Sequence, residues 1–169
     1  MKKILVPCDF SDSAVQAFIF AFQIAQQSKG EIILLHVIEI PVLRGTIQVP
    51  ALYFEESFLN DMNVSAEKKF EELKSKWTNG AINVRSMVEH GPITKTIIRI
   101  AEENSVDLIV MGTQGATGIK EFLVGSNTEK VVRFSPLPVL AIRKSLELSD
   151  IKNIVFPTTL DPNQNKLLI

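Results

Sequence analysis

The stretch DLIVMGTQGATGIKEFLVGSNTEKVVR, residues 107–133, decides the fold of this 169-residue chain. Its apolar run at 108–111 shows no polar alternation and lies between Asp107 and Gly112, which predicts a buried parallel strand. Its other end predicts a helix, because Ser126 stands at an N-cap position, Glu129 follows as in a capping box, and Pro136 stops the helix. The pattern G-x2-G-x9-G-S, which leaves the strand and opens the helix, is formed by Gly112, Gly115, Gly125 and Ser126.

This glycine pattern suits a phosphate chain. Glycines let the backbone approach a ligand closely, and a helix start offers unpaired N–H groups and the positive end of the helix dipole. The hydroxyl groups of Ser126 and Thr128 can add donors. In the alternative interpretation, Gly112 and Gly115 only turn the chain. Gly125 then only permits a tight helix entry, and Ser126 is an ordinary cap. The convergence of these residues on one strand exit and one helix entry favours phosphate binding.

The rest of the chain repeats a strand-helix-strand unit. A first apolar strand at 4–6 is followed by a helix that Ser11 or Ser13 caps and Gly30 stops. The strand at 31–37 is buried, whereas the strand at 82–88 alternates apolar and polar residues and belongs at the sheet edge. The remaining elements are helices at 55–77 and 91–104 and a strand at 139–142. This order predicts an α/β fold, a doubly wound open parallel five-stranded sheet with helices on both faces.

Several motifs together resemble the universal stress protein family. Gly112-Thr113-Gln114-Gly115 and Gly125-Ser126-Asn127-Thr128 are similar to its nucleotide-binding signature. The resemblance extends from about Met1 to about Arg143 and includes KILVPCDFS at 3–11, EHGP at 89–92 and SPLPVL at 135–140. It implies an α/β sandwich with strand order 3-2-1-4-5, often a homodimer. It also implies ATP, with Mg²⁺, as the ligand, because family members with this glycine pattern bind ATP.

The implied strand order locates the site. Ligands of such sheets bind where the chain reverses direction, beyond the carboxyl ends of the strands, and this brings Pro7-Cys8-Asp9 beside the glycine stretch. The family uses an aspartate at the position of Asp9 for nucleotide contacts, although Asp9 can instead cap the following helix. Val37 or Ile38 would offer backbone groups to the adenine edge. The candidate binding residues are Pro7, Cys8, Asp9, Val37, Ile38, Met111, Gly112, Gly115, Gly125, Ser126, Asn127 and Thr128.

Catalytic motifs are lacking in the sequence. It has no G-x4-G-K-[ST] loop, and the carboxylates near the site are mainly Asp9 and Glu129, so we expect at most slow ATP hydrolysis. His36 is interpreted as a core histidine, His90 as a loop residue near the cleft, and Cys8 as a packing residue. The predicted function is an ATP-binding stress sensor or regulator. The alternative is a non-catalytic dimerisation or interaction module with an empty cleft.

Composition and charge argue against a nucleic-acid-binding, secreted or membrane-spanning protein. The net charge is -1, and the dense basic pair Lys68-Lys69 is flanked by glutamates, so no nucleic-acid partner is expected. Cys8 is the single cysteine, which favours the reducing cytoplasm. The apolar run after Lys3 ends at Pro7, so no cleavable signal is expected. No apolar segment approaches the roughly 20 residues that a membrane helix needs.

Two segments, at 39–54 and 145–169, fall outside the regular strand-helix pattern. The nucleotide-binding domain is expected at 1–144, and residues 145–169 form an extension in which 151–161 resembles the first strand of a second repeat. The chain therefore resembles the first domain of a tandem member of the family. It is expected to be a truncated tandem protein, a tandem chain cut after its first domain, or a chain with a degenerate second repeat. We expect the strand at 154–156 to pair with a sheet edge, and the alternative is disorder from about 146. The connection at 39–54 is a candidate lid or dimer contact, or else a floppy insertion.

Overall fold

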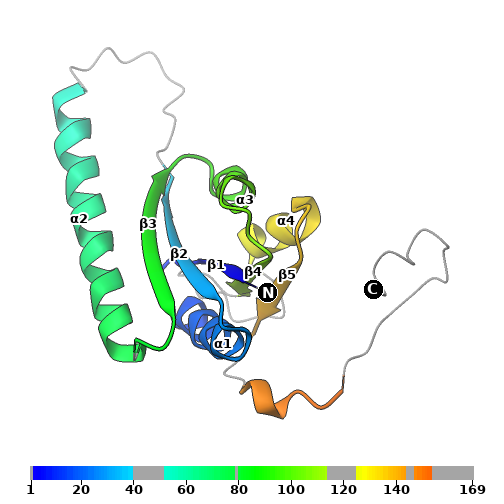
Figure 1. Ribbon diagram of the computed structural model, residues 1–169. Helices are drawn as coiled ribbons and strands as arrows, with labels where there is room; N and C mark the ends of the chain where they lie inside the picture. The colour runs from blue at the N-terminus through cyan, green and yellow to red at the C-terminus, as the bar shows by residue number, and fades with distance from the viewer. Residues whose placement is uncertain (1, 40–51, 79, 114–124, 144–146, 154–169) are drawn as a thin grey trace.

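The computed structural model describes residues 2–39, 52–78, 80–113, 125–143 and 147–153 (Figure 1). The strands are β1 (Lys3–Pro7), β2 (Glu31–Ile38), β3 (Asn83–His90), β4 (Leu108–Gly112) and β5 (Val139–Ile142). The helices are α1 (Asp12–Ser28), α2 (Leu52–Trp77), α3 (Ile93–Glu103), α4 (Ser126–Phe134) and the 3-10 helix η1 (Leu148–Asp150). No helix within the described ranges is both long and apolar enough to cross a membrane.

All five strands pair in parallel in the order β3-β2-β1-β4-β5, which confirms the predicted order 3-2-1-4-5. Ile4 of β1 is in register with Ile32 of β2 and with Leu108 of β4, so β1 is the central strand. Its neighbours β2 and β4 consist mostly of buried apolar residues, as expected for strands covered on both faces. The strand order reverses between β1 and β4, because β2 and β3 lie on one side of β1 and β4 and β5 lie on the other.

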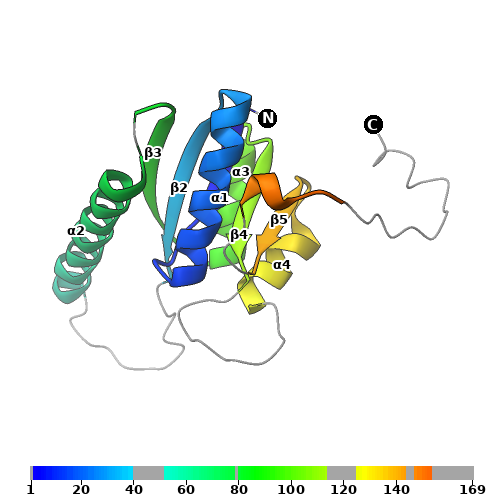
Figure 2. The same ribbon diagram turned by 90° about the horizontal axis from the view of Figure 1, so that it is seen from below.

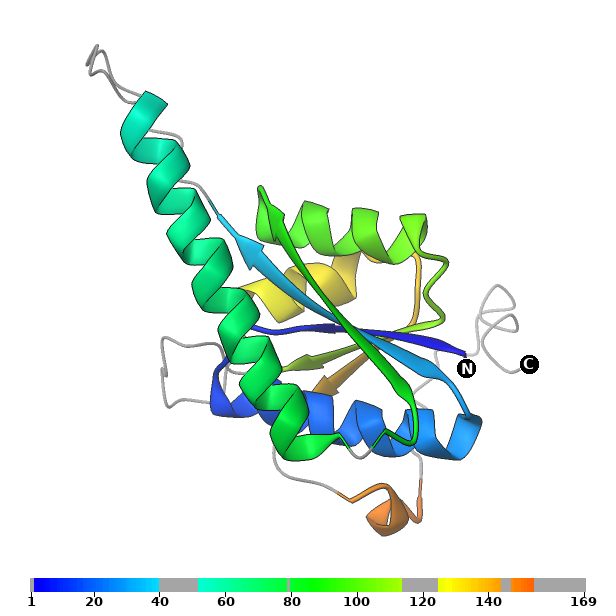
Figure 3. The same ribbon diagram turned by 60° about the vertical axis from the view of Figure 1, so that its left-hand side comes forward.

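Helices cover both faces of the sheet, as predicted. The first hydrophobic cluster joins the sheet to α1 and α2 through Phe18, Phe20 and Phe70, and the second joins it to α3 and α4 through Ile97 and Val131. Figure 2 shows α1 lying across the strands, and Figure 3 shows α3 and α4 on the opposite side from α1. In Figure 3, the first half of α2 also extends beyond the end of the sheet.

The helix boundaries differ slightly from the predicted ones. Ser11 caps α1 by accepting a hydrogen bond from the N–H of Ala14, so Ser11 and not Ser13 is the cap. The helix ends at Ser28, and its C-cap Lys29 has a left-handed backbone that directs the N–H of Gly30, the predicted stop, to the carbonyl of Ala25 (2.9 Å). Helix α2 begins at Leu52, within the predicted connection at 39–54. The rest of that connection, 40–51, lies outside the described residues.

The segment after β5 packs against α1. Gln23 of α1 donates from Nε2 to Glu147 (2.7 Å) and accepts from the N–H of Leu148 (2.7 Å), while the Leu148 side chain packs against the first hydrophobic cluster. The predicted strand at 154–156 lies outside the described residues, so its pairing stays a prediction.

Candidate functional site

A cleft of about 170 Å³ opens at the carboxyl edge of the sheet, at the ends of the neighbouring strands β1 and β4. It brings together the predicted residues Pro7, Cys8, Asp9, Val37, Met111, Gly112, Gly125, Ser126, Asn127 and Thr128. Sequence reasoning did not assign Ser13, Ala14, Leu35, His36, Ile93 and Ile97, which also line the cleft. Most of these lie at the starts of α1 and α3 or near the end of β2, and the strand order alone would have indicated those positions.

Of the predicted residues that the structure describes, Ile38 is not part of this lining. Ile38 is buried at the end of β2, and its carbonyl accepts a hydrogen bond from the N–H of Gly91 (3.0 Å). The end of β2 is therefore tied to the turn between β3 and α3, and Val37 is the residue that reaches the cleft. Gly115 lies outside the described residues, so its predicted phosphate contact stays a prediction.

Gly112 has a packing reason to be glycine. A Cβ built on it would lie 2.6 Å from the carbonyl carbon and oxygen of Ser13 and 2.7 Å from its Oγ. Contacts this short with backbone atoms require the chain to shift, so β4 and the first turn of α1 can approach only at a glycine. The phosphate interpretation of Gly112 is therefore not needed to explain this residue, although Gly112 does line the cleft.

The two halves of the glycine pattern meet in the fold. The N–H of Gly125 donates to the carbonyl of Thr113 (2.6 Å), and Thr128 Oγ1 donates to the carbonyl of Gly112 (2.7 Å). These bonds hold the start of α4 against the end of β4. They also correct one expectation: the buried Thr128 hydroxyl is a structural donor within the protein, and it does not extend the donor set offered to a ligand.

The start of α4 also differs from the predicted capping box. Gly125 is the N-cap, with no side-chain hydrogen bond, and Glu129 N donates to its carbonyl (3.0 Å). Ser126 is therefore the first helical residue and not the cap, because the helix begins one position earlier than the capping box assumes. The N–H groups of Ser126, Asn127 and Thr128 precede the first intrahelical bond and have no acceptor within the helix. With the positive end of the helix dipole, they form a donor set at the cleft.

The β1–α1 turn brings Asp9 to the same cleft. Asp9 Oδ1 accepts from the N–H (3.0 Å) and the hydroxyl (2.5 Å) of Ser11, the residue that caps α1. Asp9 therefore supports the cap but is not itself the cap. Its exposed carboxylate also lines the cleft, so the binding interpretation of Asp9 stays open to test.

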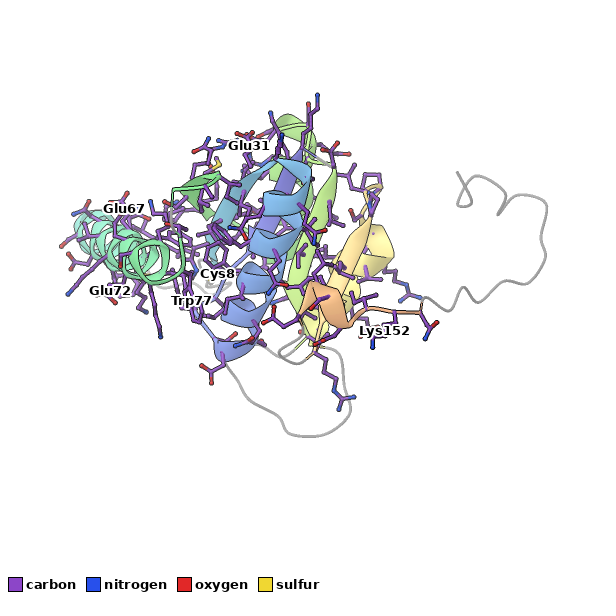
Figure 4. The ribbon with its side chains drawn as sticks, turned by 60° about the horizontal axis from the view of Figure 1, so that its bottom comes forward. Cys8, Glu31, Glu67, Glu72, Trp77 and Lys152 are labelled. Carbon is purple, nitrogen blue, oxygen red and sulfur yellow. The ribbon has the colours of Figure 1, made fainter. Side chains whose placement is uncertain are left out.

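Cys8 and the two histidines have distinct environments. Burial raises the pKa of the Cys8 thiol from 9.0 to about 12, with the negative charge of Asp9 adding to the rise, so the thiol is protonated at neutral pH. Figure 4 shows Cys8 inside the molecule, while Glu67 and Glu72 project from α2. His36, interpreted from sequence as a core histidine, instead lines the cleft and contacts the Cys8 carbonyl through Nδ1 (2.8 Å). His90 is exposed at the end of β3.

The chemistry of the cleft favours binding over bond cleavage. Of the described residues that line it, none is lysine or arginine, and its charged group is the carboxylate of Asp9. Glu129 is exposed and is not among the described lining residues. Within the described ranges, no group of three His, Cys, Asp or Glu side chains could hold a metal ion. An anion here would depend on backbone N–H groups and on a cation that the ligand brings with it.

Comparison with known proteins identifies the family of this chain. The model of the universal stress protein family matches residues 1–143. The chain belongs to that family. Universal stress protein MJ0577 of Methanocaldococcus jannaschii is 33% identical over 154 residues, which cover 85% of this chain and 95% of the relative. Universal stress protein YxiE of Bacillus subtilis is 31% identical over 147 residues, covering 84% of this chain and 99% of the relative.

Solved structures of the family share the fold. The structure of MJ0577 is 34% identical with a TM-score of 0.74, and the comparison covers 86% of this chain and 98% of that one. A universal stress protein in complex with cAMP is 22% identical (TM-score 0.59, covering 84% and 97%). One from Archaeoglobus fulgidus in complex with dAMP is 17% identical (TM-score 0.62, covering 85% and 98%). At these identities the last two show the common fold, and their ligands are adenine nucleotides.

Proposed function

We propose that this chain binds ATP, accompanied by Mg²⁺, in the cleft between β1 and β4, and acts as a stress-response sensor or regulator. The observation that carries the proposal is the meeting of the two glycine segments, which places the open first turn of α4 at the cleft. Three consecutive backbone N–H groups there suit a phosphate group. The adenine nucleotides bound by two proteins of the same fold indicate which ligand class to test first.

The cleft is lined by both polar and apolar residues. The polar lining includes Asp9 and, at the start of α4, Ser126 and Asn127 with their backbone donors. Val37, Ile93 and Ile97 form an apolar wall that suits the nucleoside. We propose that Asp9 orients the nucleoside through its hydroxyl or amino groups. Because the described lining offers no lysine or arginine, Mg²⁺ would offset the phosphate charge while bound mainly by the phosphates.

Binding without efficient catalysis fits the described residues. Phosphoryl transfer needs a positioned water or base and charge-stabilising groups, and Asp9 is held by Ser11 as part of a turn. Any hydrolysis of ATP is therefore expected to be slow. An Asp9→Asn variant should leave the rate of phosphate release at its background level, whereas a strong Asp9-dependent release would make the protein an ATPase.

A pair of variants at Ser126 tests the proposal. Proline is tolerated at the first position of a helix, and the extended backbone of Gly125 (ψ 140°) is compatible with a following proline. Ser126→Pro should therefore keep the fold while removing one backbone donor, and Ser126→Ala removes only the hydroxyl. We expect calorimetry with MgATP to show binding by the wild type and by Ser126→Ala, and affinity about tenfold lower or worse for Ser126→Pro. Equal affinities would exclude the helix start as the phosphate site.

An interaction module with an empty cleft is the second candidate function. Val132 and Phe134 are 51% and 63% exposed on α4, beside the edge strand β5. Such apolar exposure at a sheet edge is a candidate surface for the expected homodimer. Sedimentation should show a dimer that Phe134→Glu weakens. A melting temperature unaltered by saturating MgATP would favour this candidate, because a ligand that binds only the native state must raise it.

A further inference from the structure

The turn that carries Asp9 depends on a histidine of the neighbouring strand. Cys8 lies just past the paired part of β1, where its N–H still donates to the carbonyl of Leu35 (2.8 Å). The Cys8 carbonyl is contacted by Nδ1 of His36 at 2.8 Å. Because a carbonyl only accepts, Nδ1 must carry the proton in this contact, and in the neutral ring Nε2 carries none.

Phe10, two residues later, has a backbone conformation that needs support. Its φ of 63° lies in the left-handed region, which a bulky side chain rarely adopts and which is found where the surrounding structure enforces it. Its ring contacts the imidazole of His36 (centroids 4.8 Å apart) and the ring of Phe70 (5.0 Å). The ammonium group of Lys69 lies 5.2 Å from its centroid. Residues of β2 and α2 therefore hold this turn from outside the β1–α1 connection.

Asp9 lies between these two supported residues. The Asp9 carboxylate accepts hydrogen bonds from the N–H and the hydroxyl of Ser11, which fix its position. His36 is the single side chain among the described residues that contacts Cys8 by a hydrogen bond, contacts the Phe10 ring, and itself lines the cleft. We propose that His36 is a positioning residue: through Cys8 and Phe10 it holds Asp9 where the ligand requires it. This rests on the proposed function, in which Asp9 contacts the nucleotide.

The protonation state of the His36 ring provides a first test that needs no ligand. The chain has two histidines, and the exposed His90 is an internal control. In long-range ¹H–¹⁵N spectra of the full chain at a pH where both rings are neutral, we expect His36 to carry its proton on Nδ1. A His36 ring protonated on Nε2 alone would overturn the proposal, because the bond to the Cys8 carbonyl would then not exist.

Two substitutions separate the hydrogen bond from the ring contact. His36→Phe keeps an aromatic ring but has no donor, whereas His36→Asn keeps an N–H donor near the place of Nδ1. We expect His36→Phe to weaken MgATP binding about tenfold and His36→Asn to restore it to within about threefold of the wild type, with His90→Asn unchanged. Wild-type affinity in His36→Phe would overturn the proposal, as would an equal loss in both variants.

The single cysteine reports on the turn directly. The buried, protonated Cys8 thiol should react with a disulfide reagent only when the turn opens. We expect His36→Phe to raise the modification rate about tenfold and His36→Asn to bring it back toward the wild-type rate. An unchanged rate in His36→Phe would show that His36 does not hold the turn. If the wild type binds no nucleotide, the proposed function fails, and the tautomer and thiol rate still decide whether His36 holds the turn.

Discussion

Replacing Thr128 by valine should loosen the junction between β4 and α4. Thr128 is 4% exposed, and its Oγ1 donates to the carbonyl of Gly112 at 2.7 Å. Valine has nearly the same shape but no hydroxyl, so the substitution removes the donor and leaves the carbonyl without this partner. The junction is the contact that brings the two glycine segments together, and the variant therefore tests the part of the fold on which the cleft depends.

The expected cost follows from the loss of this part-buried bond. Leaving its acceptor without this partner costs about 1–3 kcal/mol of unfolding free energy. For a domain of this size, each kcal/mol lowers the melting temperature by about 2–4 °C. Urea unfolding followed by circular dichroism measures the free energy, and a thermal scan measures the temperature.

Thr128→Ser is the matched control. It keeps the hydroxyl and loses one methyl group, at a cost of about 0.8 kcal/mol. The valine variant should therefore be the less stable of the two. If valine leaves stability unchanged while serine lowers it, the methyl group and not the hydrogen bond holds the junction, and the reasoning is wrong.

Three further variants test other contacts. Gly112→Ala should lower the unfolding free energy by about 1–3 kcal/mol, because its Cβ meets the backbone of α1 at 2.6 Å; unchanged stability in urea would contradict this packing. Gln23→Ala should release the segment at Leu148, detected as faster proteolysis after β5, whereas the exposed Gln26→Ala should not. Because the folded-state pKa of Cys8 is raised, the unfolding free energy should fall as pH rises from about 9 toward about 12. Cys8→Ala should remove this contribution to the pH dependence of stability, which urea titrations at a series of pH values measure.

The architecture was predictable because it rests on strong local patterns. The uninterrupted apolar run at 108–111 and the alternation at 82–88 distinguish a central strand from an edge strand, and the sheet has them in those places. The order of the strands was less accessible, since periodicity does not say which strands pair. That order came from the family resemblance and agrees with the sheet.

The details of the site were harder to predict, because they depend on contacts between distant segments. Nothing local to Gly112 reveals that the first turn of α1 lies against it, and nothing local to Thr128 reveals that its hydroxyl is taken by Gly112. The strand pattern made His36 a core residue, whereas β1 ends at Pro7, opposite Leu35, so that His36 lies past the paired part of β1 and lines the cleft. The capping box at Ser126 failed for a different reason: a glycine in an extended conformation can begin the helix one residue earlier.

The central claim is that a nucleotide binds at the junction of β4 and α4. Titrating the ¹⁵N-labelled chain with MgATP and following its backbone amide signals tests it most directly. We expect the largest and saturable shifts at Ser126, Asn127 and Gly112, with smaller shifts at Asp9. An unaltered spectrum at millimolar MgATP, or shifts confined to α2 and the segment after β5, would contradict the claim.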